Sequence, residues 1–93
     1  MSLTFEWDAD KGIRNVSRHG ISFEEAESIF RDQLSTTISD PDHSLGEERF
    51  ITIGLSSLNR LLVVAHADEG NRVRLISARR ATRAERQRYE EET

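Results

Sequence analysis

The 93-residue sequence contains no cysteine, a single proline and only one lysine. Without cysteine, neither a disulfide framework nor a thiolate metal site can form. No apolar run approaches the roughly 20 residues that a membrane-spanning helix needs, and the first ten residues lack the basic start and apolar stretch of a signal peptide. Because only 6% of the residues are aromatic and 35% hydrophobic, we predict a modest core in one domain spanning residues 1–93.

The charged residues are unevenly distributed. Twelve arginines accompany the single Lys11, and the formal net charge is −4. Residues 1–47 contain four basic and ten acidic side chains, whereas residues 48–93 contain nine basic and seven acidic ones. We therefore predict a protein with one acidic face and one basic face, in which arginine suits contact with phosphate groups or carboxylates.

The basic half has its highest charge density between residues 72 and 88, where seven of seventeen residues are arginine. This stretch predicts a strand, with Val73, Leu75 and Ser77 on one side, that turns at residues 79–81 into a helix. Two adjacent arginines at such a corner can present forked donors to a phosphate or a carboxylate. The alternative interpretation is a solvated helix face with charge pairs three and four residues apart.

Apolar periodicity and capping residues predict two helices, a meander of four antiparallel strands and a last helix, which is an α+β fold. The predicted helices run from the N-cap Asp8 to about His19, from Ser22 to Asp32, and from Thr82 to about Glu91. The predicted strands cover residues 34–39, 49–56, 60–68 and 73–79. The third of these is the most apolar and is predicted to be central.

Three smaller features complete this prediction. Phe5 and Trp7 form a short apolar segment that is compatible with an edge strand. On the first helix, Ala9, Ile13 and Val16 share one side. Residues 40–46 have the composition of a loop, and the apolar residues of the last helix predict that Ala84 and Tyr89 are its buried positions.

The sequence offers few motifs for catalysis. Its three histidines are far apart, so no metal site is predicted, and there is no serine-hydrolase or glycine-rich nucleotide motif. Metal-independent cleavage of RNA fits better, because RNA carries its own nucleophile, the 2′-hydroxyl, and arginines can stabilise the developing negative charge. The candidates for proton transfer are His19, Glu48, Lys11 and Tyr89.

Several segments of the chain occur in a characteristic order. They are Phe5–Asp8 with Lys11 and Asn15, Arg18–Ala26, Phe30 with Asp32, Asp42–Ser44, Glu47–Phe50, Ile53-Gly54, Ile76–Thr82, Glu85-Arg86 and Tyr89-Glu90. Together they resemble the BrnT family of bacterial proteins over nearly the whole chain.

The resemblance implies a type II toxin with a RelE-like fold, acting in the bacterial cytoplasm as a ribonuclease that arrests translation without a cofactor. It also implies a cognate BrnA-type antitoxin with a ribbon-helix-helix DNA-binding part. Toxin and antitoxin would form a hetero-oligomer that binds operator DNA only through the antitoxin and does not bind membranes.

The active-site candidates carried over by this resemblance are Lys11, His19, Glu48, Arg49, Arg60, Arg79, Arg80 and Arg86, and the roles assigned to them are our own inference. Arg79 and Arg80 are expected to bind the scissile phosphate, Arg49 and Arg60 to support that charge, and Glu48 or His19 to transfer protons. The remaining candidates are Lys11 for catalysis and Arg74, Arg83 and Arg86 for substrate binding. These groups must converge on one concave face. If they do not act on RNA, the alternative is a non-catalytic module whose arginine face serves complex formation and operon co-repression.

Overall fold

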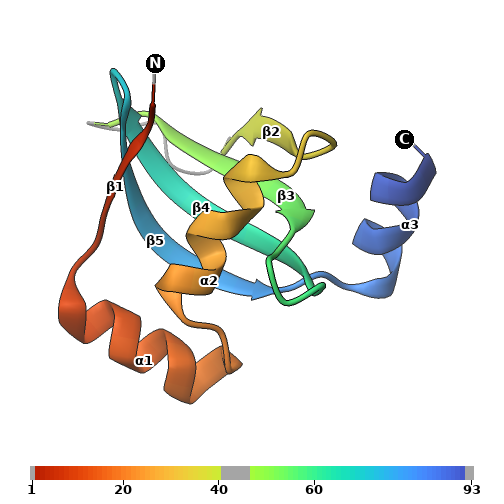
Figure 1. Cartoon of the computed structure of the whole chain (residues 1–93), viewed down its shortest axis with the longest axis horizontal. Helices are drawn as coiled ribbons and strands as arrows, with labels where there is room; N and C mark the ends of the chain where they lie inside the picture. The colour runs from red at the N-terminus through yellow and green to blue at the C-terminus, as the bar shows by residue number, and fades with distance from the viewer. Residues whose placement is uncertain (1, 41–46, 92–93) are drawn as a thin grey trace.

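The computed structural model of the chain describes residues 2–40 and 47–91. Its elements in chain order are β1 (Thr4–Glu6), α1 (Ala9–His19), α2 (Phe23–Ser28), the 3-10 helix η1 (Ile29–Arg31), β2 (Thr36–Ser39), β3 (Arg49–Leu55), β4 (Leu61–Glu69), β5 (Arg72–Arg80) and α3 (Arg83–Glu91). Figure 1 shows α2 crossing one face of the sheet, with α3 beyond the end of β5. None of the described helices is long and apolar enough to cross a membrane.

The sheet has five strands in the order β1-β5-β4-β3-β2. The four predicted strands are present as β2 to β5, they pair antiparallel, and β4 is central as expected. The prediction of a purely antiparallel four-stranded sheet was wrong in one respect. β1 pairs in parallel with residues 72–74 of β5, so the sheet is mixed. A strand of three residues is too short to produce a clear alternation in the sequence.

The first two helices begin and end where the capping residues predict. The side chain of Asp8 accepts hydrogen bonds from the backbone N–H groups of residues 10 and 11, and Gly20 ends α1 with a φ of 73°. The hydroxyl of Ser22 accepts a bond from the N–H of Glu25 at the start of α2. The second predicted helix divides into α2 and η1, which together end before Asp32.

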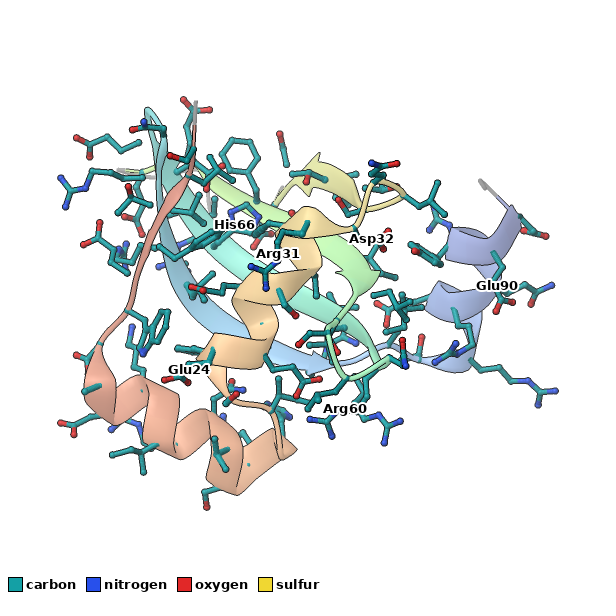
Figure 2. The ribbon with its side chains drawn as sticks, in the orientation of Figure 1. Glu24, Arg31, Asp32, Arg60, His66 and Glu90 are labelled. Carbon is teal, nitrogen blue, oxygen red and sulfur yellow. The ribbon has the colours of Figure 1, made fainter. Side chains whose placement is uncertain are left out.

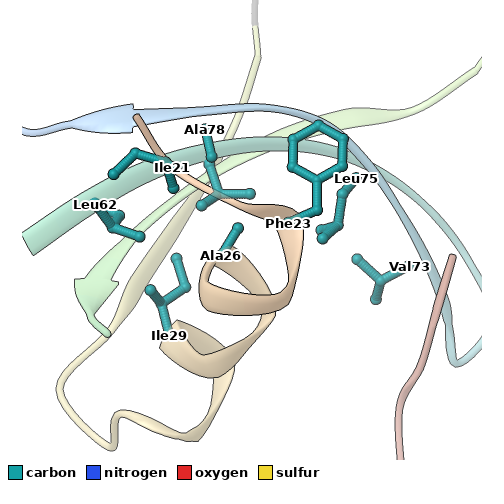
Figure 3. Packing of buried hydrophobic residues seen from close by; sticks show 9 residues of the cluster. Ile21, Phe23, Ala26, Ile29, Leu62, Val73, Leu75 and Ala78 are labelled. Atoms are coloured by element: carbon teal, nitrogen blue, oxygen red, sulfur yellow. The ribbon is translucent and has the colours of Figure 1, made fainter. Parts of the chain in front are cut away.

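The hydrophobic core lies between α2 with η1 and one face of the sheet, which we call the inner face. Figure 3 shows Ala26 and Ile29 facing Leu62, with Phe23 close to Leu75; all of these side chains belong to the buried core. At Gly54 a β-carbon would lie 3.0 Å from the β-carbon of Ser35 and 3.1 Å from the carbonyl oxygen of Ile29. Glycine at this position therefore lets η1 approach the sheet closely.

A β-bulge changes which residues of β5 face the core. Ala65 of β4 pairs with Ser77, but the next residue, His66, pairs with Leu75, so β5 contains one extra residue at this point. As a result Leu75 and Ala78 are both buried, whereas Ser77 is exposed. The predicted strict alternation, which placed Ser77 with Leu75, was wrong beyond the bulge.

The apolar residues of the first and last helices are not buried, which corrects the prediction for Ala84 and Tyr89. On α1, Ile13 and Val16 are 69% and 48% exposed, and the only buried residue is Asn15. Among the residues that the structure describes in α3, none is buried: Ala84 is exposed and Tyr89 is half-buried. Both helices are attached mainly through polar side chains, which a hydrophobic pattern does not reveal.

Candidate functional site

A cleft of about 510 Å3 separates α1 from the edge of β5. It is lined by Lys11, Arg14, Asn15, Ser17, Arg18 and His19 of α1 and by Ile76 and Ser77 of β5. Three of these residues are cationic, one is histidine, and none is acidic. The cleft therefore combines positive charge with a side chain that can accept and donate protons.

Asn15 fixes α1 against β5. Because β1 covers only residues 72–74, the rest of β5 is an open sheet edge. The Asn15 amide nitrogen donates to the carbonyl oxygens of Ala78 (2.9 Å) and Ile21 (2.8 Å). Its oxygen accepts a bond from the N–H of Ala78 at 3.1 Å. These bonds satisfy the exposed backbone of β5 at Ala78 and hold the basic flank of α1 beside the strand.

The cations of the cleft have no ion-pair partner in the part of the chain that the structure describes. Lys11, Arg14 and Arg18 form no ion pair with any other residue in the ranges 2–40 and 47–91. Their spacing of three and four residues puts them on one flank of the helix, where like charges repel each other by a few tenths of a kcal/mol per pair. A bound polyanion would relieve this repulsion.

The arginine at the predicted corner is paired internally instead. Arg79 donates to both carboxylate oxygens of Glu85, at 2.8 and 2.9 Å. Glu85 also accepts a bond from the N–H of Thr82 and forms the predicted capping box at the start of α3. Mainly because of Arg79, the pKa of Glu85 falls to about 2. Arg79 therefore attaches α3 to β5.

Arg60 forms a second internal pair. Its Nε donates to Glu25 at 2.9 Å, a second contact joins its Nη2 to the other carboxylate oxygen, and Nη2 also reaches the carbonyl of Gly20. Ser56 donates to the same carboxylate at 2.7 Å. Glu25 is buried, and the hydrogen bonds from Arg60 hold its pKa below the ordinary value despite that burial. Figure 2 shows Arg60 at the β3–β4 connection.

Arg49 and Arg74 share one carboxylate at the opposite end of the sheet. Glu47 accepts bonds from Arg49 at 3.2 Å and from Arg74 at 2.5 Å, and these bonds lower its pKa. The neighbouring Glu48 is exposed, and its carbonyl accepts a bond from the N–H of Asp68. This group lies near the start of β5, whereas Arg80 lies at its end.

The predicted catalytic residues do not converge on one centre. Arg79 and Arg80 are consecutive in a strand and therefore point to opposite faces of the sheet, with Arg80 on the side of Glu25. Lys11 and His19 line the same cleft, and Arg60 and Arg80 both lie beside Glu25, where Arg60 also reaches the carbonyl of Gly20 next to His19. The others are distributed over separate regions: Arg49, Arg74 and Glu48 at the far sheet end, and Arg83 and Arg86 on α3.

The sequence contained a signal for the cleft that the prediction did not use. Arg14 and Arg18 were not among the predicted candidates, although they follow Lys11 at helical spacing on a helix that was correctly predicted. Because arginine is so frequent in residues 72–88, the phosphate-binding site was predicted there instead. Asn15 places this flank of α1 against β5 through its bonds to Ala78, which is 63 residues away in the sequence. Apolar periodicity cannot reveal a contact over such a distance.

The remaining described histidine has a structural role. His66 is buried between the rings of Phe30 and Phe50, and its two ring nitrogens lie 2.7 Å from the Thr52 hydroxyl and 2.6 Å from an oxygen of Asp68. Among residues 2–40 and 47–91, no three histidine or carboxylate side chains are gathered as metal ligands. The predicted loop, with Asp42 and His43, lies outside the described residues apart from Asp40.

Comparison with known proteins identifies a family and a similar solved structure. Residues 7–85 match the family described as the ribonuclease toxin, BrnT, of type II toxin-antitoxin systems. The fold is similar to that of the Brucella abortus ribonuclease toxin BrnT, known from a crystal structure, with a TM-score of 0.64 and 21% identity over 88% of this chain and 100% of that one. No curated protein sequence is significantly similar to the chain.

Proposed function

The chain belongs to the BrnT family of ribonuclease toxins of type II toxin-antitoxin systems, and we propose that it cleaves RNA without a metal ion in the cleft between α1 and β5. The observation that carries this proposal is the set of basic side chains, Lys11, Arg14, Arg18 and His19, lining a cleft without acidic residues. The family makes RNA the substrate, so the open question is where and how the chain cleaves it.

The charge of the cleft supports binding of the RNA backbone. Lys11, Arg14 and Arg18 are exposed and form no ion pair with the other described residues, so an incoming phosphate does not have to displace a carboxylate. Arginine can bind two oxygens of one phosphate at once. The same charge would repel a divalent cation, which supports a metal-independent reaction.

In the proposed reaction, His19 accepts the proton of the 2′-hydroxyl as this oxygen attacks the adjacent phosphorus. A new O–P bond forms, and the bond from phosphorus to the 5′-oxygen of the next nucleotide breaks. The products are a 2′,3′-cyclic phosphate and a 5′-hydroxyl, which takes up a proton from the protonated His19, from Lys11 or from water. Arg14 and Arg18 stabilise the charge that develops on the phosphate oxygens.

The other predicted site residues receive different roles in this proposal. Arg60 and Arg79 hold α2 and α3 in position through Glu25 and Glu85. Arg80, which is exposed near Glu25, extends the basic surface beyond the C-terminal end of α1. Arg49, Arg74, Arg83 and Arg86 can contact RNA outside the cleft, and Glu48 is not required for proton transfer.

The family implies an antitoxin partner, and its finer properties are proposals too. We infer a BrnA-type ribbon-helix-helix antitoxin that forms a hetero-oligomer with the toxin and contacts operator DNA itself. We also infer that the whole chain acts as one domain in the bacterial cytoplasm, where cleavage of RNA would arrest translation. The single hydrophobic core of the described residues supports the one-domain inference.

A pair of matched charge reversals tests the cleft. Arg18 and Arg31 are both exposed arginines without an ion pair among the described residues, but Arg31 lies on η1, away from the cleft (Figure 2). We expect Arg18→Glu to lower cleavage of single-stranded RNA by about 10- to 100-fold, from the loss of one charged contact and the added repulsion. Arg31→Glu should have little effect.

Cleavage should be measured with purified protein in EDTA, and the RNA ends should be identified. Equal losses in Arg18→Glu and Arg31→Glu would show a general effect of charge and reject the cleft. Cleavage that disappears in EDTA and returns with a divalent ion would reject the metal-independent mechanism. If the folded wild-type protein cleaves no RNA but binds its antitoxin, the chain acts instead as a partner-binding module.

A further inference from the structure

The outer face of the sheet, opposite to α2, carries an apolar trough beside α3. Successive residues of a strand point to opposite faces of the sheet. Because Thr52, Leu62 and Val64 point to the inner face, their neighbours in β3 and β4 form the floor of the trough on the outer face. The trough has a volume of about 160 Å3. Its lining residues are Thr36, Ile38, Ile51, Ile53, Val63, Glu85, Arg88 and Tyr89. Aliphatic side chains from three neighbouring strands thus form a continuous surface.

α3 covers this trough only at one side. None of the described α3 residues is buried. The helix is attached by the Arg79–Glu85 pair at its start and by the Tyr89 hydroxyl, which donates to Asp32 at 2.5 Å, near its end. Within residues 2–40 and 47–91, α3 therefore covers the apolar floor between β2 and β4 only along the side of Glu85, Arg88 and Tyr89.

Further apolar side chains extend the trough at the edge of the sheet. The Asp32 carboxylate binds the N–H groups of Leu34 and Leu55 as well as Tyr89, so these residues surround it. Leu34 is 53% exposed and Leu55 39%, and Ile38 on the edge strand β2 is 58% exposed. Because the exposed side chains are aliphatic and come from several elements, this surface favours a protein segment as its occupant.

The charges around the trough indicate the chemistry of that segment. Arg88 lines the trough and forms no ion pair with another described residue. Glu85, the other charged residue of the lining, is paired with Arg79, and the Asp32 carboxylate at the edge of the trough accepts a bond from Tyr89. Arg88 is therefore the charge of the lining that a carboxylate of a partner can pair with. A second copy of this face would bring like charges together, whereas a segment with apolar and acidic residues would be complementary.

We propose that the cognate antitoxin anchors an apolar segment with acidic residues in this trough. The trough and the RNA cleft adjoin, because the register connects Ile51 of the trough to Ala65 and Ala65 to Ser77 of the cleft. A segment anchored at Ile38 and Ile51 can therefore extend its acidic end over Lys11 and Arg14. The coverage of the cleft by the acidic end rests on the proposed function of the cleft, whereas the anchoring of the apolar segment in the trough does not.

The test uses two matched substitutions of exposed isoleucines. Ile38→Glu places a carboxylate in the trough, and Ile13→Glu makes the same change on α1, where Ile13 is 69% exposed and does not line the cleft. The probe is the purified antitoxin encoded beside this toxin. We expect Ile38→Glu to weaken its binding about tenfold or more and Ile13→Glu to leave it unchanged. Without antitoxin, both variants should cleave RNA like the wild type.

Four results would be informative. Unchanged antitoxin affinity of a folded Ile38→Glu variant, or an equal loss in Ile13→Glu, overturns the proposal. A loss of RNA cleavage in Ile38→Glu, with antitoxin binding intact, assigns the trough to RNA and also overturns it. If Arg18→Glu retains full cleavage while Ile38→Glu loses the antitoxin, the proposed cleft is wrong but the anchor stands. Circular dichroism of each variant confirms that it is folded.

Discussion

Arg14 and Arg18 of the α1 cleft and Arg79 of the β5–α3 corner differ in what they contact. In the cleft, Arg14 and Arg18 form no ion pair within the described residues. At the corner, Arg79 is held by both oxygens of Glu85. Arg79 is therefore not available to a phosphate, whereas Arg80, Arg83 and Arg88, like the cleft arginines, form no ion pair with another described residue. Which arginines can bind a phosphate thus depends on their partners and not on their number in a segment.

This difference has an energetic basis. An arginine that already donates two bonds to a carboxylate must lose them before it can bind a phosphate, and charge-assisted hydrogen bonds contribute about 1.5–3 kcal/mol each. The cleft arginines lose only bonds to water. Substitutions in the cleft should therefore change activity with little change in stability, whereas substitutions of paired arginines should mainly change stability.

The largest effect is expected from His19→Ala. Loss of a group that transfers protons in the transition state typically lowers the rate by about 10²- to 10⁴-fold. Because His19 is exposed at the end of α1, the free energy of unfolding should stay within about 0.5 kcal/mol of the wild type. Single-turnover cleavage at saturating protein and urea unfolding measure the two quantities. A full cleavage rate in this variant would remove His19 from the mechanism.

Arg60→Ala should mainly lower the free energy of unfolding. It leaves the carboxylate of Glu25, whose side chain is 4% exposed, without its main partner. Removing one member of a buried pair typically costs about 3–5 kcal/mol, and we expect the lower end because Arg60 itself is 29% exposed. Urea unfolding tests this, with Arg31→Ala as the matched control. A change below about 1 kcal/mol in Arg60→Ala would show that the pair contributes little.

Acid should destabilise the same paired regions. The folded-state pKa values of Glu25 and Glu85 are lowered, that of Glu85 from 4.5 to about 2. The unfolded chain therefore binds protons first, and the stabilisation is complete above about pH 4.5 and is lost as the pH falls toward 2. Amide exchange in α3 should rise over this range in the wild type. In Glu85→Gln, this acid-dependent rise in amide exchange should be absent. If the rise persists in that variant, another titrating group causes it.

The smallest effect is expected at the other attachment of α3. Tyr89→Phe removes the hydrogen bond to the Asp32 carboxylate and should cost about 1.5 kcal/mol, the lower end for a bond to a charged group, because Asp32 keeps two backbone N–H partners. Burial and Asp32 raise the pKa of Tyr89 to about 12, so the contribution is complete below about pH 10 and is lost as the pH rises through 12. The difference between wild type and Tyr89→Phe in urea unfolding at neutral pH measures it. An unchanged midpoint would mean that only the Arg79–Glu85 pair holds α3.

Much of the fold follows from the sequence alone. The caps at Asp8, Gly20 and Ser22, the capping box at Thr82 and Glu85, and the four strands β2 to β5 were all predicted correctly. These features depend on contacts between residues close in sequence or on a regular apolar period, so local physics determines them. The segments that resemble the BrnT family led to the correct family because their order is also a property of the sequence.

Tertiary structure decided the rest. The parallel partner of β1, the bulge that turns Ser77 outward and the bonds from Asn15 to Ala78 all join residues far apart in the chain. No local sequence pattern specifies which distant residues come into contact. Whether an arginine is paired or free depends on which carboxylate the fold brings beside it. The sequence by itself therefore determined the elements and the family, and only the folded chain decided where its positive charge is available.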